Sequence, residues 1–257
     1  MPVFRTYVPE SLQNYNHLVY CHSSGHAAAV DPFDANHLVN AADAQSFKLT
    51  QIWITHEHGD HIRNLSELKA RTGALVFAPE ACKGKFEADH WLADGDTLSI
   101  GETRAEFWYT PGHTPGHGVY YLPGKTPELI CGDTLFNAGV GNTRSGNVET
   151  LYTSIKRILD RCAPDTRIYP GHDYLLNNLN FALSLEPNLD IALEWVRDCT
   201  QQSPETRATT TLLDEHQFNP FLRLEDPGLI KALQNSGHDT STLLSRFTAL
   251  RQLRDRW

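Results

Sequence analysis

Short apolar runs separated by turn residues fill the first two-thirds of the chain and predict β-strands. Runs of about four to eight apolar, β-branched or aromatic residues, bounded by glycine, proline or polar clusters, are typical of buried strands. One such run ends at Asp31-Pro32, because proline cannot supply the next hydrogen bond of a ladder. The predicted strands are residues 17–21, 27–30, 51–54, 74–77, 97–100, 105–109, 119–122, 128–131 and 167–169.

Helical spacing is found between some of these strands and dominates the last third of the chain. The predicted helices of the first part are residues 35–44, 62–71 and 151–161. From Leu175 on the apolar pattern is helical, with breaks at residues 186–188 and 218–220. We therefore expect a boundary near residue 172, which leaves a C-terminal helical portion of a size allowed for a domain.

The composition is that of a globular protein, and its net charge argues against two classes of binding partner. The 257 residues are 40% apolar and 21% charged, which is typical of a chain that folds around a core. The formal net charge of −9 argues against a nonspecific grip on nucleic acid and against docking on anionic lipid. We therefore expect neither a nucleic acid nor a membrane as a partner.

The cysteine pattern bears on the compartment. The five cysteines are widely spaced and form no Cys-x-x-Cys pair, so we expect free thiols in a reducing cytoplasm rather than a disulfide framework or a zinc ribbon. No N-terminal stretch combines a basic region with an apolar core. No apolar run approaches the roughly 20 residues that cross a bilayer. The sequence does not predict an oligomeric state.

The chemistry of the chain is concentrated in residues 55–61, THEHGDH, directly after a predicted strand. His56 and His58 point the same way in an extended segment, and Gly59 lets the chain turn before Asp60 and His61. Imidazole nitrogens and carboxylate oxygens are ligands of borderline metals such as Zn²⁺. These four donors predict a metal centre; they can serve two adjacent metals but cannot complete both shells.

Three further donors follow other predicted strands. His113, Asp133 and His172 each come directly after a glycine at such a strand end, and glycine permits a close approach of the backbone to a site. A lone histidine after a strand is usually a solvated loop residue. Beside the run at residues 56–61, however, these three are expected to supply the missing ligands.

The motifs H-x-H-x-D-H (56–61), T-P-G-H-T (110–114), G-D-T (132–134) and G-H-D (171–173) resemble those of the metallo-β-lactamase superfamily. The resemblance spans roughly Tyr15 to Tyr174 and implies an α/β fold, an αββα sandwich with the metal site at one edge. It implies one metal on His56, His58 and His113, a second on Asp60, His61 and His172, and Asp133 as a bridge. Asp31 matches a position that orients a metal ligand, and His117 is expected to pack rather than to bind.

Further segments are similar to the glyoxalase II family, the hydroxyacylglutathione hydrolases. They are residues 131–136 (CGDTLF), the stretch from 171 to 187, and residues 219–223 (NPFLR). This likeness covers nearly the whole chain and implies a metallo-β-lactamase-like catalytic domain (1–172) followed by a C-terminal helical, substrate-binding domain (173–257).

The same likeness implies a thioesterase that uses a metal-bound hydroxide. It would hydrolyse S-2-hydroxyacylglutathione, in the first place S-D-lactoylglutathione, to glutathione and a 2-hydroxy acid. Two divalent ions are implied as cofactors, zinc first and iron or manganese as alternatives. Asp60 is expected to help orient the nucleophile as well as to bind metal.

Basic residues near the C-terminus are candidates for gripping a glutathione carboxylate. Arg251 and Arg254 share a face of a helix and match basic positions of the family, as Tyr174 matches another substrate-contacting position; the alternative is an ordinary solvated helix end. After Gly141 the family has one basic and two aromatic residues, whereas this chain has 142–144, Asn-Thr-Arg. Arg144 either replaces the missing charge, or the pocket prefers another thioester.

Other functions of similar sequences are the alternatives. A glutathione persulfide dioxygenase looks similar around the first motif but uses a single iron and oxygen. A hydrolase of another thioester, a β-lactamase or a nuclease of the same fold would share the metal motifs. A non-catalytic metal-binding or electron-transfer protein is the remaining class, and no flavin-binding segment supports it. The helical C-terminal portion and residues 219–223 favour the glutathione thioesterase.

Overall fold

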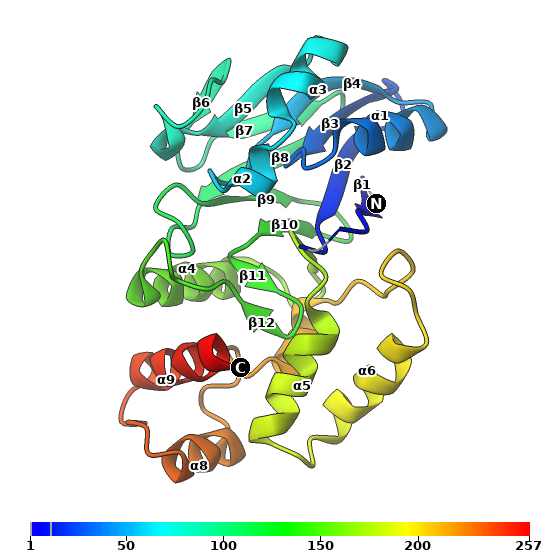
Figure 1. Cartoon of the computed structure of the whole chain (residues 1–257). Coiled ribbons are helices and arrows are strands. Elements are labelled where there is room, and N and C mark those ends of the chain that lie inside the picture. The colour runs from blue at the N-terminus through cyan, green and yellow to red at the C-terminus, as the bar shows by residue number, and fades with distance from the viewer. Residues whose placement is uncertain (1, 11) are drawn as a thin grey trace.

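Two β-sheets stacked face to face form the centre of the computed structural model, which describes residues 2–10 and 12–257 (Figure 1). The first sheet has the strand order β1-β2-β3-β4-β5-β6 and the second β13-β10-β9-β8-β7. The strands of the first are β1 Val3–Tyr7, β2 Tyr15–Cys21, β3 His26–Val30, β4 Lys48–Trp53, β5 Leu75–Pro79 and β6 His90–Leu92. Those of the second are β7 Thr97–Ile100, β8 Thr103–Tyr109, β9 Gly118–Leu122, β10 Glu128–Gly132 and β13 Arg167–Pro170.

Alternating side chains of each strand explain why the sheets are covered on both faces. On β2, Val19 faces the second sheet, whereas Leu18 faces the helices α1 Ala35–Ala44 and α3 Leu65–Thr72 outside the first sheet. On β9, Tyr120 lies between the sheets and Val119 faces α4 Val148–Arg161 outside the second sheet. Successive side chains of a strand point to opposite faces, so short fully apolar runs produce four layers. The predicted αββα arrangement is confirmed.

One predicted helix was wrong in its extent. Residues 62–71 were expected to form a single helix, but the structure has α2 Gly59–Ile62 and then α3, with a break at Arg63 and Asn64. The Asn64 amide donates to the Pro32 carbonyl at 2.9 Å, and the Asn64 side chain accepts from the Ala35 amide at 3.3 Å. Contacts to residues some 30 positions away therefore end one helix and start the next, which helical spacing cannot reveal.

Several short elements were not predicted. These are β1, β6, a one-turn 3₁₀ helix at Glu80–Cys82, and the hairpin of β11 Leu135–Phe136 and β12 Gly139–Val140. Two-residue strands carry no periodic signal. The hairpin directly follows Asp133, and Ala138 at its turn has a φ of 57°, a left-handed conformation that costs a non-glycine residue free energy.

The rest of the described chain is helical and gathers beyond α4, on the side of the second sheet away from the first (Figure 1). The helices are α5 Leu175–Leu185, α6 Asp190–Thr200, α7 Leu212–Phe218, α8 Pro227–Asn235 and α9 Leu243–Arg256. Phe247 and Leu250 of α9 share one apolar cluster with Leu151 and Ile155 of α4. Because this core is continuous across residue 172, the division into two domains there stays a prediction.

Among the described residues, no helix is both long enough and apolar enough to span a bilayer.

Candidate metal centre

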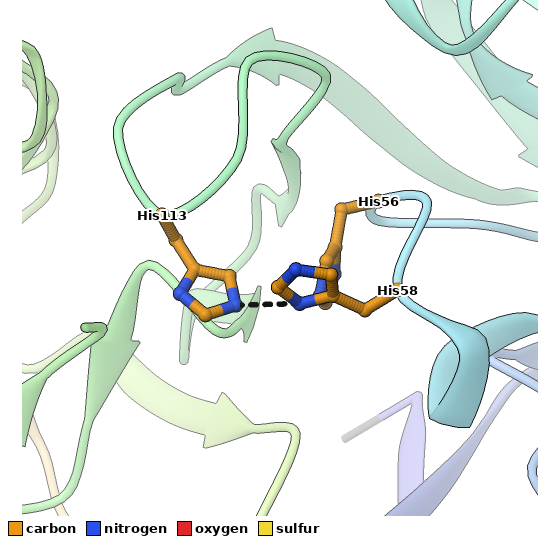
Figure 2. Close-up of side chains that lie close together, drawn as sticks. All are labelled: His56, His58 and His113. Atoms are coloured by element: carbon orange, nitrogen blue, oxygen red, sulfur yellow. Dashed lines mark hydrogen bonds between the residues drawn. The ribbon is translucent and has the colours of Figure 1, made fainter. Parts of the chain in front are cut away.

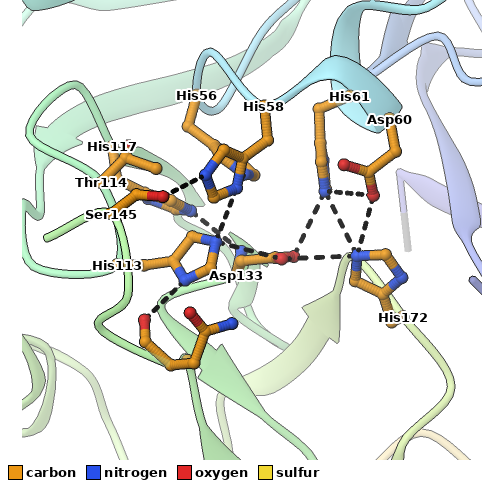
Figure 3. A network of polar contacts seen from close by, with 12 residues as sticks. His56, His58, Asp60, His61, His113, Thr114, His117, Asp133, Ser145 and His172 are labelled. Atoms are coloured by element: carbon orange, nitrogen blue, oxygen red, sulfur yellow. Dashed lines mark hydrogen bonds and ion pairs between the residues drawn. The ribbon is translucent and has the colours of Figure 1, made fainter.

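The loops that follow four strands meet at one edge of the sandwich. Strands β8, β10 and β13 run in the same direction, because β9 is antiparallel to both β8 and β10 and β13 is parallel to β10. Their carboxyl ends carry His113, Asp133 and His172, and the end of β4 in the facing sheet leads into residues 55–61. The seven side chains predicted to bind metal come together here (Figure 3).

Three imidazoles converge in the first half of this centre. His58 Nδ1 lies 3.2 Å from His56 Nε2 and 3.0 Å from His113 Nε2 (Figure 2). These three ring nitrogens point at one another, and hydrogen bonds among them cannot give each nitrogen a partner. Ligand atoms of a tetrahedral zinc site, with zinc–nitrogen distances of about 2.0–2.1 Å, lie about 3.3 Å apart. The spacing therefore fits a metal ion.

The second half contains two imidazoles and a carboxylate. His61 Nε2 lies 3.3 Å from His172 Nε2, and the two nitrogens lie 3.4 Å and 3.3 Å from Asp60 Oδ2. As in the first half, all ligand atoms lie within 4.8 Å of one another. The side-chain amide of Asn14 donates to Asp60 Oδ2 at 3.1 Å and holds this carboxylate in place.

Asp133 lies between the two halves, as Figure 3 shows. Its Oδ2 is 3.4 Å from His113 Nε2 and 3.3 Å from His172 Nε2, and its Oδ1 is 3.4 Å from His61 Nε2. Asp133 Oδ1 is buried and has no hydrogen-bond partner within the described part of the chain. A buried carboxylate oxygen without a donor is costly unless a cation compensates its charge. This orphaned oxygen also fits a bound metal.

The carboxylates create a preference for positive charge in the second half. Burial lowers the pKa of His61, but the charges of Asp133 and Asp31 outweigh it and raise that pKa well above its ordinary value. Burial likewise opposes charge on His172, yet Asp133 raises its pKa to about 9. In the first half, burial lowers the pKa values of His56 and His113. Metal binding requires neutral imidazoles, so the first half is already in the required state, and in the second half a bound cation would replace the protons that the carboxylates favour on His61 and His172.

Each of the five converging histidines has a hydrogen-bond partner on its outward nitrogen. These pairs are His56 Nδ1 with Thr55 Oγ1 (2.9 Å), His58 Nε2 with Ser145 Oγ (3.1 Å), His61 Nδ1 with Asp31 Oδ2 (2.9 Å), His113 Nδ1 with the Asn142 carbonyl (2.8 Å) and His172 Nδ1 with the Leu12 carbonyl (2.8 Å). Such partners fix ring orientation and leave the inward nitrogen as an acceptor.

Asp31 and His117 lie behind the converging atoms. Asp31 accepts from the Thr55 amide and the Thr55 hydroxyl, both at 2.7 Å, as well as from His61. His117 Nε2 accepts from the Asp133 amide at 2.9 Å and does not face the centre. Gly132 has a φ of 47° and lies against Thr55 and His117; a Cβ there would lie 2.6 Å from Thr55 Oγ1 and 2.8 Å from His117 Nε2, so only glycine fits.

Some contacts in the site were not predicted. Asn14, Leu12, Ser145 and the Asn142 carbonyl supply hydrogen bonds to the predicted ligands. None of them belongs to a motif, and two act through backbone carbonyls that every residue carries. Thr55, which contacts His56 Nδ1, differs from these four residues because it directly precedes the histidine run in the sequence.

The four residues predicted to contact substrate line one pocket next to the centre. Tyr174, Arg144, Arg251 and Arg254 surround a space of about 250 Å³ together with Phe136, Val140, Asn142, Asn178, Asp255 and Trp257. The Tyr174 ring stacks on the His172 ring, with centroids 4.9 Å apart and an interplanar angle of 1°. The pocket therefore adjoins the second half of the centre.

The three arginines differ in how free their guanidinium groups are. Arg251 is buried and donates to the Val140 and Gly141 carbonyls at 2.9 Å and 3.2 Å and to Asp255, which leaves little of its capacity of five donors. Arg254 donates twice to Asn178 Oδ1. The exposed side chain of Arg144 makes no hydrogen bond or ion pair with residues 2–10 or 12–257.

Comparison with known proteins decides the family. Residues 23–172 match the family model of the metallo-β-lactamase superfamily, and residues 173–257 match that of the hydroxyacylglutathione hydrolase C-terminus. The chain is 38% identical to the hydroxyacylglutathione hydrolase of a Polaromonas species, over the whole of both chains. It belongs to the hydroxyacylglutathione hydrolase family. The relative of that name from Nitrosococcus oceani is 36% identical, again over both whole chains.

Solved structures agree with this hydroxyacylglutathione hydrolase fold. ETHE1 from Myxococcus xanthus superimposes with a TM-score of 0.69 at 24% identity, and the alignment covers 99% of this chain and 95% of the ETHE1 chain. The BLEG-1 B3 metallo-β-lactamase superimposes with a TM-score of 0.65 at 22% identity, and the alignment covers 85% of this chain and 99% of the BLEG-1 chain. At these identities the likeness shows the fold alone. The family and the donor clusters together indicate a divalent metal site.

Proposed function

We propose that this chain hydrolyses the thioester bond of S-2-hydroxyacylglutathione, with S-D-lactoylglutathione as the first substrate to test. The observation that carries the proposal is a pocket with unsatisfied cationic groups opening beside two converging sets of metal donors. The relatives named hydroxyacylglutathione hydrolase, which match over the whole chain, support the same substrate class.

Within this proposal, His56, His58 and His113 would hold one metal ion, and Asp60, His61 and His172 would hold a second. Asp133, whose oxygens lie next to ligands of both halves, would contribute to holding both ions. Zinc suits imidazole with carboxylate, and iron or manganese are the alternatives. When bound, such ions lower the pKa of a coordinated water and polarise a carbonyl oxygen.

The chain's own residues position the reacting groups. In the hydrolysis, a water oxygen bonds to the thioester carbonyl carbon, the carbon–sulfur bond breaks, and its electron pair leaves with sulfur as a thiolate. The proton lost by water passes to the thiolate or to solvent. Asp60 is partly exposed, with 22% of its side chain accessible, and Asn14 holds it, so it is placed to orient the attacking water. A thiolate leaves without help from a strong general acid.

The arginines divide the work of substrate binding. Arg144 and Arg254 keep N–H groups free for a carboxylate of glutathione, and guanidinium forks bind carboxylates well. Tyr174 supplies an aromatic wall and a hydroxyl next to His172. Arg251 acts mainly by holding the carbonyls of Val140, which lines the pocket, and of Gly141. Residues 173–257 are proposed to be the substrate-binding domain on this basis.

A steady-state assay over a panel of thioesters tests the proposal. The panel contains S-D-lactoylglutathione, other glutathione thioesters, and the same acyl groups on coenzyme A. We expect turnover of the glutathione esters, with Arg254→Gln and Arg144→Gln raising KM. Arg256→Gln, at an exposed position of the same helix outside the pocket, is the matched control. No turnover of any glutathione thioester by metal-loaded protein contradicts the proposal.

The metal content and oxygen uptake separate this function from a persulfide dioxygenase. A mononuclear iron site needs one set of donors, whereas this chain brings together two sets that share no residue, His56 with His58 and His113, and Asp60 with His61 and His172, so we expect two metals per chain. Oxygen consumption on glutathione persulfide with one iron per chain would favour the dioxygenase. We also propose a cytoplasmic location, since all five cysteines are free.

A further inference from the structure

The loop between β12 and α4 contains residues 142–144, where the sequence departs from the family pattern, and Ser145 directly after them. Both ends of this loop are fixed by backbone hydrogen bonds, from the Gly141 amide to the Thr134 carbonyl at 3.2 Å and from the Asn147 amide to the Gly112 carbonyl at 2.9 Å. The Gly146 amide closes an internal turn by donating to the Thr143 carbonyl at 3.1 Å. The loop therefore has a defined path across the first half of the metal centre.

Two histidines of that half form hydrogen bonds with this loop through their outward ring nitrogens. His113 Nδ1 donates to the Asn142 carbonyl at 2.8 Å, and His58 Nε2 shares a hydrogen bond of 3.1 Å with the Ser145 hydroxyl (Figure 3). The first partner is a backbone group that no substitution at residue 142 removes. The second is a side chain, so the orientation of His58 depends on the residue at position 145.

His58 differs from the other four converging histidines in two respects. It presents Nδ1 to the centre, where the others present Nε2. It is only half-buried, and its partner Ser145 is exposed, whereas His56, His61, His113 and His172 are all buried. Packing therefore restrains the His58 ring least, and a hydrogen bond on its outward nitrogen has the most effect on where Nδ1 points.

We propose that Ser145 is a positioning residue, whose hydroxyl holds the His58 ring with Nδ1 toward the metal centre. The inference rests on the proposed role of His58 as a ligand. Partners of this kind typically change metal affinity or activity by about 10–100-fold when they are removed. Because Asn142 and Arg144 of the same loop line the pocket, the loop connects the pocket wall to His58 and His113, which would hold the first metal.

Three variants test the role of Ser145. Ser145→Ala removes the hydroxyl, Ser145→Thr keeps it, and Thr143→Ala is a control on the same loop, since no side-chain hydrogen bond of Thr143 is found among the described residues. Metal per chain is measured after equilibration with a series of chelator concentrations, together with kcat and KM at saturating metal.

We expect Ser145→Ala to bind one of its two metals about tenfold more weakly, and Ser145→Thr and Thr143→Ala to bind like the wild type. At saturating metal, KM should stay near the wild-type value, because no substrate contact is removed. Wild-type metal affinity in Ser145→Ala, or equal weakening in Ser145→Thr, overturns the inference. Metal binding needs no substrate, so this result is independent of whether a glutathione thioester is hydrolysed.

Discussion

Asp31 accepts a hydrogen bond from His61 Nδ1 at 2.9 Å while its own backbone has a φ of 51°. This left-handed conformation is tolerated best by glycine, asparagine and aspartate. It turns the chain at the end of β3, so that the carboxylate reaches both His61 and the Thr55 hydroxyl. Since Thr55 Oγ1 in turn contacts His56 Nδ1, one carboxylate orients a histidine in each half of the centre.

Replacing Asp31 by asparagine should weaken metal binding without unfolding the protein. Asparagine tolerates the positive φ, but it has one acceptor oxygen where aspartate has two and it lacks the negative charge. We expect the affinity for the metal on His61 to fall about 10–100-fold, measured by chelator competition. Asp43→Asn, at an exposed position of α1, is the control and should bind metal normally; equal affinity in both variants would contradict the role given to Asp31.

Alanine at Asp133 should affect both metals, whereas alanine at His58 should affect one. Asp133 faces both halves of the centre and His58 only the first. We expect both variants to lose thioester hydrolysis, and mass spectrometry of the metals to show fewer ions per chain, with the greater loss in Asp133→Ala. His216→Ala, at an exposed position away from the centre, should keep its metals and activity. Activity retained in either variant would refute the proposed centre.

Arg251 and Arg254 should respond differently to truncation. Arg251 is 5% exposed and joins α9 to the carbonyls of Val140 and Gly141. Hydrogen bonds to charged groups contribute about 1.5–3 kcal/mol, so Arg251→Ala should lower the free energy of unfolding by about 2–3 kcal/mol in urea denaturation. Arg254→Ala should chiefly raise KM and should lower the free energy of unfolding by less than Arg251→Ala, because the Arg254 side chain is only half-buried. A larger loss of stability in Arg254→Ala and a larger rise of KM in Arg251→Ala would contradict this assignment of roles.

Stability should fall with rising pH because of Glu215. This carboxyl is fully buried, and burial raises its pKa to about 7 from an ordinary 4.5, although it accepts from Thr210, Asn219 and the Ala138 amide. Because the pKa of Glu215 is higher in the folded state than in the unfolded state, the folded state favours the protonated carboxyl. Its contribution to the free energy of unfolding is therefore complete below pH 4.5 and is lost as the pH rises to about 7. The shift corresponds to on the order of 3 kcal/mol, at about 1.4 kcal/mol per pKa unit.

Glu215→Gln removes the ionisation and keeps an acceptor for the Ala138 amide. We expect the metal-free variant to gain stability relative to metal-free wild type between about pH 5 and pH 7.5, in urea denaturation at a series of pH values. Glu149→Gln, at an exposed position of α4, should follow the wild type at every pH. Parallel stability curves for wild type and Glu215→Gln would show that Glu215 does not ionise in this range.

Local patterns in the sequence were sufficient for most of the architecture. The apolar run before Thr55 and the helical spacing of residues 35–44 predicted elements that the structure contains, because strand and helix periodicities are properties of neighbouring residues. The histidine run at residues 56–61 likewise predicted a metal centre from donors that are close in sequence. His113, Asp133 and His172 could be added because each follows a strand and the family motifs mark it.

Contacts between distant residues were decided only by the tertiary structure. The break at Asn64 depends on Pro32 and Ala35, and the hairpin at residues 135–140 is too short for a periodic signal. Arg251 and Arg254 share a helix, but only packing decides that the first is buried against backbone carbonyls and that the second is half-buried at the pocket, with part of its guanidinium left without a partner among the described residues. The outward partners of the histidines, Ser145 among them, depend on which loops cross the site. Hydrogen bonds select whatever donor or acceptor the fold brings within reach, and sequence spacing does not encode that distance.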